Sequence, residues 1–133
     1  LKRITMSWGD VLHAYKSGDQ GLNNFGEVYF SWVKIGSVRD WKCHKRMTMN
    51  LVVPVGNVRF AFIEGDLSNS EYRLEEIGVD RYARLRVAPG IWFSFRSVGS
   101  SDGLLVNFAD MAHDQTEVLR KPLSTRNIDW GAD

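Results

Sequence analysis

The sequence has 133 residues, of which 44% are hydrophobic and 25% charged, and its formal net charge is +1. This length predicts a single domain, and this composition excludes an intrinsically disordered chain. The near balance of 17 basic and 16 acidic residues excludes a polynucleotide-binding surface, because no large positive field exists. The single cysteine, Cys43, excludes an intrachain disulfide, and no apolar run is long enough to span a membrane, so we expect a cytoplasmic protein.

Residues 1–25 are predicted to form an N-terminal arm that precedes the regular strand pattern. Turn-forming residues gather at 7–10 and 17–21, on either side of a short mixed stretch at 11–16. We expect one helical turn in this stretch.

Residues 26–112 are predicted to form a β-barrel, because short apolar and aromatic runs alternate here with Gly, Asn, Asp and Ser. The predicted strands are 27–35, 47–55, 58–64, 72–78, 83–88, 91–98 and 104–109. Seven short strands without a helical period predict a sandwich or a jelly-roll barrel. The polar residues 113–133 are expected to form a C-terminal extension over the barrel surface.

The dipeptide Gly56-Asn57 separates two of these runs, 47–55 and 58–64. A Gly-Asn connection supplies the positive φ that tight antiparallel turns need. We therefore predict that the two runs pair as a hairpin with a fixed register.

A basic segment, Arg-Asp-Trp-Lys-Cys-His-Lys-Arg, occupies residues 39–46 between two predicted strands. In an extended chain, successive side chains point to opposite sides, which places Lys42 with His44 and Trp41 with Cys43. One of these sets is expected to line a pocket, where cations suit a phosphate or diphosphate. The alternative is a solvated basic loop.

Two later segments also bring aromatic or polar groups toward a barrel mouth. Residues 89–95 form a turn and an aromatic strand, in which two of the three rings are expected in the core and the third is free to stack on a sugar or base. Residues 104–110 lead into His113-Asp114, a pair that is by itself more often structural than catalytic.

Six short motifs follow one another in a characteristic order over about residues 25–130. They are Gly-Glu-Val-Tyr-Phe at 26–30, Val-Arg-Asp-Trp at 38–41, Asn-Leu-Val-Val-Pro-Val-Gly at 50–56, Pro-Gly-Ile-Trp at 89–92, Leu-Val-Asn at 105–107 and Ile-Asp-Trp at 128–130. This ordered set resembles the dTDP-4-dehydrorhamnose 3,5-epimerase-like cupins. The resemblance implies an all-β, cupin-type double-stranded β-helix, or jelly-roll barrel, with an N-terminal arm that is exchanged between the subunits of a homodimer.

The same resemblance implies that the barrel holds a nucleoside-diphosphate sugar with a 4-ketone, and that no metal or redox cofactor is needed. A base removes a proton beside the ketone, a cation holds the enolate, and an acid returns the proton. In the family the loop reads Arg-Gly-x-His with the His as base, whereas Asp40 and Lys42 replace the Gly and the His here. The enolate lysine falls near Met49, and the tyrosine acid falls within 111–113, which has no Tyr. The acidic partner of the His is absent around 123–125.

A second branch of the superfamily, the nucleotide-sugar 3,4-ketoisomerases, carries a His-x-His-Lys loop, and its second His is retained as His44 followed by Lys45. Imidazole titrates near neutral pH, so His44 suits a proton shuttle. Lys42 suits an enolate clamp or a base, and His113 with Asp114 suits a second acid–base group. The sequence thus predicts an epimerase or ketoisomerase of a nucleotide-linked 4-keto sugar in cell-surface polysaccharide biosynthesis.

The remaining candidate site residues are expected to bind the substrate. They are Arg39, Lys45, Asn50, Arg59, Trp92, Asn107 and Asp114. Because four expected catalytic positions differ, the alternative is a catalytically inactive cupin that binds a sugar nucleotide or a partner protein. A metal cupin needs two His and a Glu around one ion, but the three histidines include His13 in the arm, so we predict no metal site.

Overall fold

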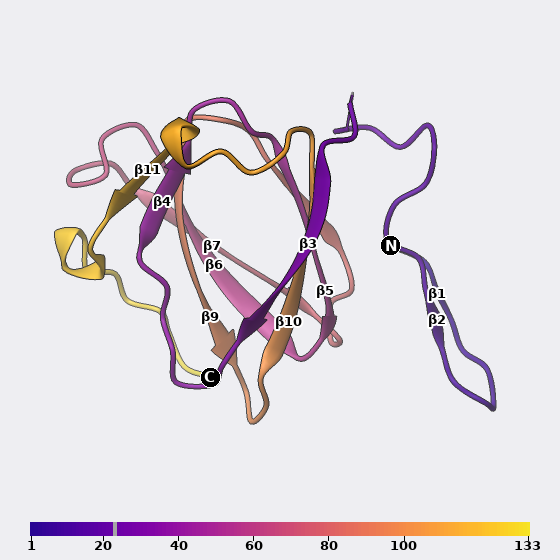
Figure 1. Ribbon diagram of the computed structural model, residues 1–133. Helices are drawn as coiled ribbons and strands as arrows, with labels where there is room; N and C mark the ends of the chain where they lie inside the picture. Colours follow the sequence, from indigo (N-terminus) through magenta and orange to yellow (C-terminus); the bar gives the residue numbers. More distant parts are fainter. Residues whose placement is uncertain (23) are drawn as a thin grey trace.

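The computed structural model describes residues 1–22 and 24–133. Two antiparallel sheets face each other and form a jelly-roll barrel (Figure 1). The four-stranded sheet has the order β3 (Glu27–Val33), β10 (Gly103–Ala109), β5 (Met49–Val55) and β8 (Arg84–Val87). The five-stranded sheet has the order β11 (Val118–Lys121), β4 (Trp41–His44), β9 (Ile91–Val98), β6 (Asn57–Glu64) and β7 (Tyr72–Gly78). The predicted all-β cupin-type fold is confirmed.

The main core lies between the two sheets and follows from strand alternation. Along β6, Val58 and Phe60 are fully buried in this core, whereas Ala61 and Ile63 belong to a second apolar cluster. Side chains of a strand alternate between faces, so a strand that is apolar on both faces must be covered on both. The five-stranded sheet is therefore a middle layer of the molecule.

The C-terminal residues cover the outer face of this sheet. Leu123, Ile128 and Trp130 pack against the second cluster, which contains the fully buried Trp41. The segment also includes the 3₁₀ helices η1 (Gln115–Glu117) and η2 (Leu123–Thr125) and the strand β11, which pairs with β4. Strand β11 was not predicted, because Val-Leu-Arg-Lys lacks clear alternation.

The predicted hairpin over 47–64 is wrong. Strand β5 pairs with β10 and β8, whereas β6 pairs with β9 and β7, so the two strands lie in opposite sheets. Gly56 has a φ of 70°, but it turns the chain from one sheet to the other. Each strand already has a hydrogen-bonded neighbour along both of its edges, so neither has a free edge for the other.

The N-terminal arm contains a small hairpin in place of the expected helical turn, which is a second wrong prediction. Strands β1 (Arg3–Ile4) and β2 (Val11–Leu12) pair antiparallel, and Figure 1 shows them beside the barrel. β-branched Val11 disfavours a helix and favours a strand. Asn23, within the predicted arm, lies outside the described residues.

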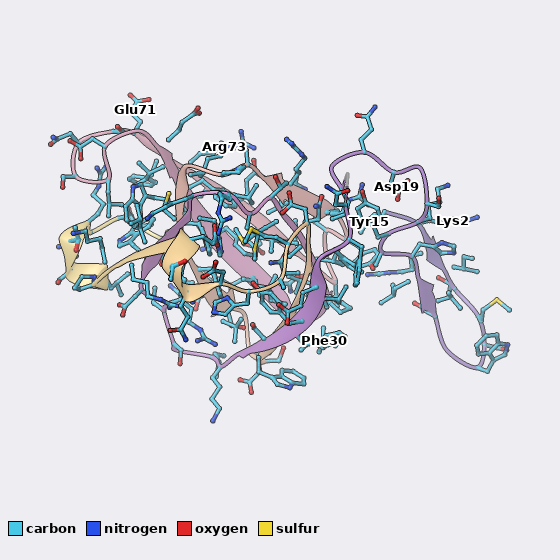
Figure 2. The ribbon with its side chains drawn as sticks, turned by 45° about the horizontal axis from the view of Figure 1, so that its top comes forward. Lys2, Tyr15, Asp19, Phe30, Glu71 and Arg73 are labelled. Atoms are coloured by element: carbon cyan, nitrogen blue, oxygen red, sulfur yellow. The ribbon has the colours of Figure 1, made fainter. Side chains whose placement is uncertain are left out.

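The arm contacts the barrel through residues that follow this hairpin. Tyr15, labelled with Asp19 in Figure 2, donates its hydroxyl to the carbonyl of Asp19 at 2.8 Å. The guanidinium of Arg84 on the barrel lies 4.5 Å from the Tyr15 ring. The division into arm, barrel and extension at 25/26 and 112/113, and the exchange of the arm, stay predictions. Among the described residues, no helix has the length and apolar character to cross a membrane.

Candidate active site

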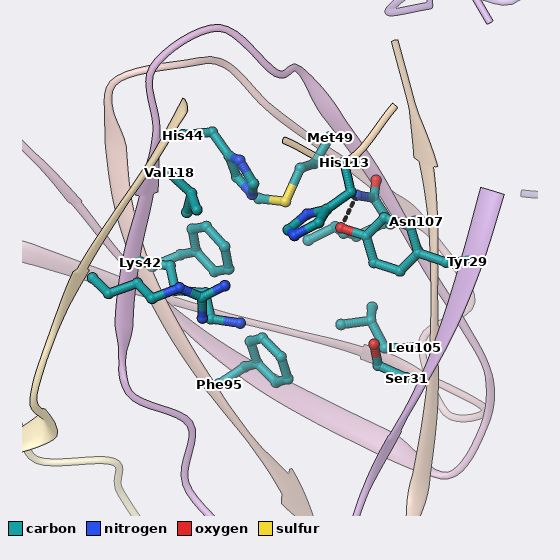
Figure 3. Close-up of a pocket in the computed structure, with 13 residues that line it drawn as sticks. Tyr29, Ser31, Lys42, His44, Met49, Phe95, Leu105, Asn107, His113 and Val118 are labelled. Carbon is teal, nitrogen blue, oxygen red and sulfur yellow. Dashed lines mark hydrogen bonds between the residues drawn. The ribbon is translucent and has the colours of Figure 1, made fainter. Parts of the chain in front are cut away.

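A pocket of about 70 Å³ opens between the two sheets, where β3 faces β4 and β11. Its walls bring together residues that are distant in the sequence, as Figure 3 shows. The polar lining comprises Tyr29, Ser31, Lys42, His44, Asn107, His113 and Arg120, and the apolar lining comprises Met49, Leu51, Phe93, Phe95, Leu105 and Val118. A concave, largely apolar site with a few convergent polar groups is typical of a small-molecule site.

The centre of this pocket is His44, which is held by a buried carboxylate. Nδ1 of His44 contacts Oε1 of Glu117, and both side chains are almost fully buried. This contact occupies Nδ1 and leaves Nε2 as the ring atom that can exchange a proton with a ligand. The His44 ring also stacks on Phe93, with centroids 5.8 Å apart.

The second carboxylate oxygen of Glu117 is also satisfied. Oε2 accepts the backbone N–H groups of Arg46 at 3.0 Å and Met47 at 3.2 Å. Burial alone would raise the pKa of Glu117, but the hydrogen bonds from His44 and from these two amides hold that pKa below its ordinary value. Glu117 is thus an ionised carboxylate that orients the imidazole.

Cations gather on the same side of the pocket. Lys42 on β4 lies directly across from Arg120 on β11. Burial lowers the pKa of the Lys42 ammonium, Arg120 and Arg39 lower it further, and Asp40 acts in the opposite direction. A neighbouring hollow of about 260 Å³ is also lined by Lys42 and Arg120, so these two side chains border both spaces.

The opposite wall carries a phenol and an amide. Nδ2 of Asn107 on β10 donates to the hydroxyl of Tyr29 on β3 at 2.9 Å, and Oδ1 of Asn107 accepts the N–H of Asn50 at 3.2 Å. Burial raises the pKa of Tyr29, although the bond from Asn107 opposes this effect. The phenol therefore stays protonated and can act as a proton donor.

Of the predicted site residues, the pocket brings together Lys42, His44, Asn107 and His113. His113 lies at the exposed rim, where its backbone N–H donates to Glu27 at 2.9 Å. Arg39 lies beside the pocket, with its guanidinium 5.9 Å from the Phe95 ring and a bond to the Trp32 carbonyl. The segment 41–44 is thus a strand and not the alternative solvated loop.

The other predicted binding residues lie outside this pocket and have other contacts. Lys45 is exposed, and Trp92 packs in the outer cluster. The buried Asn50 donates to the carbonyls of Gly21 and Phe108. Arg59 binds Glu76 and the carbonyls of Trp130 and Ala132, and Asp114 caps η1 and pairs with Arg46. Each of these side chains leaves the strand on the face opposite the pocket or lies in a flanking loop.

Sequence reasoning missed three residues of this site. The family resemblance places the acidic partner of the histidine around 123–125. In the structure, Glu117 of η1 is the carboxylate that contacts His44. Tyr29 lies within the Gly-Glu-Val-Tyr-Phe motif at 26–30. Strand alternation places it on the face opposite the exposed Phe30, which is the signal that could have identified it. Arg120 gave no signal, because β11 was not predicted.

A larger hollow of about 690 Å³ lies between β7 and β8, lined by residues such as Phe62, Leu85 and Ile91. It contains none of the predicted site residues. Within residues 1–22 and 24–133, no group of three His, Cys, Asp or Glu side chains could hold a metal ion.

The fold is similar to that of solved sugar-nucleotide enzymes. A dTDP-sugar isomerase from Desulfovibrio desulfuricans G20 is 32% identical, with a TM-score of 0.90 over 99% of this chain and 88% of that one. A dTDP-4-dehydrorhamnose 3,5-epimerase from Sulfolobus tokodaii is 20% identical, with a TM-score of 0.79 over 96% and 76% of the two chains. The sugar 3,4-ketoisomerase QdtA from Thermoanaerobacterium thermosaccharolyticum, solved with TDP, is 21% identical, with a TM-score of 0.73 over 90% and 83%.

Comparison of the sequence with family profiles and with curated proteins gave no match. The likeness therefore rests on the solved structures.

Proposed function

Because the chain belongs to the dTDP-4-dehydrorhamnose 3,5-epimerase-like cupins, we propose that it is an epimerase or ketoisomerase of a dTDP-linked 4-keto sugar. The observation that carries this proposal is the buried pair of His44 and Glu117, which faces a pocket with Lys42 on one wall and Tyr29 on the other. Structures of the 3,4-ketoisomerase QdtA in complex with TDP and with TDP-4-keto-6-deoxyglucose support this substrate class. The product would serve cell-surface polysaccharide biosynthesis.

Proton transfer beside the ketone is the chemistry that this arrangement suits. Nε2 of His44 removes a proton from the carbon next to the carbonyl, and Glu117 stabilises the imidazolium that forms. Lys42, two residues away on the same strand, lines the same pocket and acts at the carbonyl group. Tyr29, on the opposite wall, returns a proton from the other face of the sugar.

The cations at the pocket rim provide a place for the diphosphate. Arg120 borders both the pocket and the neighbouring hollow, so it can contact a diphosphate that joins a sugar in the first space to a nucleoside in the second. Guanidinium groups bind phosphate oxygens through charge-assisted hydrogen bonds. Arg39 lies beside the same rim.

The test is hydrogen–deuterium exchange at the carbons flanking the ketone of dTDP-4-keto-6-deoxyglucose in D₂O, followed by NMR. We expect exchange with the unmodified protein and a loss of at least about 100-fold in His44→Asn. His13→Asn is the matched control, because His13 lies in the arm. Equal exchange in His44→Asn and the unmodified protein would refute the assignment of His44.

A second candidate function is a non-catalytic sugar-nucleotide sensor. It is favoured by Met49, which lines the pocket where the resemblance places the enolate lysine and which offers no cation. Calorimetry that detects binding of the keto sugar nucleotide, without exchange by NMR, would support this function. Absence of binding would exclude both functions.

We also propose a homodimer. Phe30 and Trp32 on β3 are 66% and 58% exposed, and β3 is an edge strand of its sheet. Figure 2 shows Phe30 at the surface. Exposed aromatic groups beside an unpaired strand edge are typical of a surface that pairs with another chain.

A further inference from the structure

Lys42 differs in its surroundings from a lysine that serves as a simple counter-ion. Its cross-strand neighbours are Arg120 on β11 and Phe93 on β9, a cation and an aromatic ring. In the described part of the chain, no carboxylate forms an ion pair with Lys42. The nearby Asp40 instead accepts the backbone N–H of Leu123 at 3.0 Å.

These surroundings raise the fraction of Lys42 that is present as the neutral amine. Burial among aromatic groups disfavours the ammonium, and Arg120 and Arg39 repel it, so the pKa of Lys42 lies below its ordinary value. A neutral amine is a nucleophile toward carbonyl carbons, and desolvation beside another cation is a recognised way to prepare one. The ammonium of a surface lysine lacks this reactivity.

The geometry places this amine beside the proton carrier. Lys42 and His44 are two residues apart on β4, so their side chains leave the same face with Cα atoms roughly 7 Å apart. Both line the pocket, and Figure 3 shows Lys42 directed into it below His44. A ligand carbon attached to Nζ of Lys42 therefore lies in the same pocket as the imidazole of His44.

We propose that Lys42 forms an imine with the ketone of the substrate, and this inference rests on the proposed function. The Nζ lone pair attacks the carbonyl carbon, and the carbonyl oxygen takes up the electron pair and a proton. The carbinolamine then loses this oxygen as water, which carries both hydrogens of the neutral amine, and a proton taken up from solvent leaves the imine nitrogen protonated. The protonated imine draws electrons from the adjacent C–H bond more strongly than a ketone does.

The imine also selects the reaction. His44 removes the adjacent proton to give an enamine, a proton returns to the same carbon from the other face, and water hydrolyses the imine to regenerate ketone and lysine. A shift of the ketone to the next carbon would instead leave the lysine nitrogen on the sugar as an amine. Lys42 thus directs the site to epimerisation.

The experiment is reductive trapping of the full chain with dTDP-4-keto-6-deoxyglucose and sodium cyanoborohydride in D₂O. We expect a mass adduct on the peptide that contains Lys42, and no adduct at this position in Lys42→Arg or Lys42→Met. Because Lys42→Arg keeps the positive charge but cannot form an imine, its exchange should fall at least about 100-fold. The matched control is Lys34→Met, in an exposed turn, which should keep both adduct and exchange.

The two proposals fail differently. Exchange by the unmodified protein without an adduct on Lys42, or exchange in Lys42→Arg within about threefold of the unmodified protein, overturns the imine and leaves the proposed function intact. An adduct without exchange supports the imine and refutes the isomerase. The trapping experiment uses the unmodified protein, so it tests for the imine on Lys42 even if a Lys42 variant does not fold.

Discussion

Glu117 joins the chemistry of the pocket to the stability of the barrel. Its carboxylate contacts His44 and accepts two backbone N–H groups of the turn after β4, and its side chain is 1% exposed. A buried carboxylate with these partners stabilises the fold when it is ionised. The same charge orients the imidazole for proton transfer.

Replacement of Glu117 by Gln should weaken the pH dependence of the free energy of unfolding at acid pH. The pKa of Glu117 is lower in the folded chain than in the unfolded one, so its stabilisation is present above the unfolded pKa and is lost as the pH falls through the folded value. We expect urea unfolding of Glu117→Gln to depend less on pH below about 4.5 than that of the unmodified protein. Glu71→Gln, in an exposed loop, is the control, and an identical pH dependence in all three proteins would contradict the prediction.

Tyr29 is expected to act in proton return and not in nucleotide binding. Tyr29→Phe removes the hydroxyl that faces the pocket but keeps the ring, so exchange with a keto sugar nucleotide should fall at least about tenfold, with little change in the Kd for dTDP. NMR exchange and calorimetry measure these two quantities. Tyr82→Phe, outside the pocket, should change neither. A Tyr29→Phe protein with full exchange would remove Tyr29 from the mechanism.

The turn between β5 and β6 decides how these elements are shared between the sheets. Gly56 has a positive φ, and a Cβ at this position would collide with the carbonyl oxygen of Asp102. Only glycine fits both conditions without strain. This crossing places Met49 and Leu51 of β5 in one wall of the pocket. It places Phe60 of β6 in the main core, on the inner face of the opposite sheet.

Gly56→Ala should therefore destabilise the fold by at least about 2 kcal/mol, from backbone strain together with overpacking. Gly36→Ala is an informative control, because Gly36 also has a positive φ, of 79°, but has open space around it. It should cost only about 1 kcal/mol, from backbone strain. Denaturant unfolding compares the two, and equal losses would show that the contact with Asp102 contributes nothing.

The whole molecule leaves an aromatic surface uncovered on the side of β3. Phe25, Phe30 and Trp32 are all more than half exposed, whereas the outer face of the other sheet is covered by the C-terminal residues. The two sheets thus differ in what covers their outer faces. The proposed dimer would cover the exposed aromatic residues beside β3, in the four-stranded sheet.

Trp32→Lys should convert the proposed dimer to a monomer, because a charge on the shared surface would have to be desolvated in each subunit. Sedimentation velocity measures the change in mass. Leu119→Lys, an exposed position on β11, is the control and should leave the association state unchanged. If the unmodified protein is a monomer at high concentration, the dimer proposal fails.

Seven of the strands and the all-β class follow from local patterns, since alternation and turn residues act over a few positions. These patterns left a sandwich and a jelly-roll barrel open, and the family resemblance indicated the cupin-type barrel. These patterns also place Lys42 and His44 on one face of an extended segment, as the structure has them. Local patterns do not state which strands pair, because a buried strand can be satisfied by several partners. This is why β5 and β6 were paired wrongly.

The pairing of His44 with Glu117 depends on contacts between residues 73 positions apart. The hydrogen bond between Asn107 and Tyr29 likewise joins residues that are 78 positions apart. The amino-acid sequence alone was sufficient for the class of fold and for the expectation that the basic segment 39–46, if extended, presents Lys42 and His44 on one side. Only the tertiary structure revealed Glu117, Tyr29 and Arg120 as part of the site. Closure of the barrel places β3 across the pocket from β4, and the pairing of β11 with β4 brings η1 and β11 beside it.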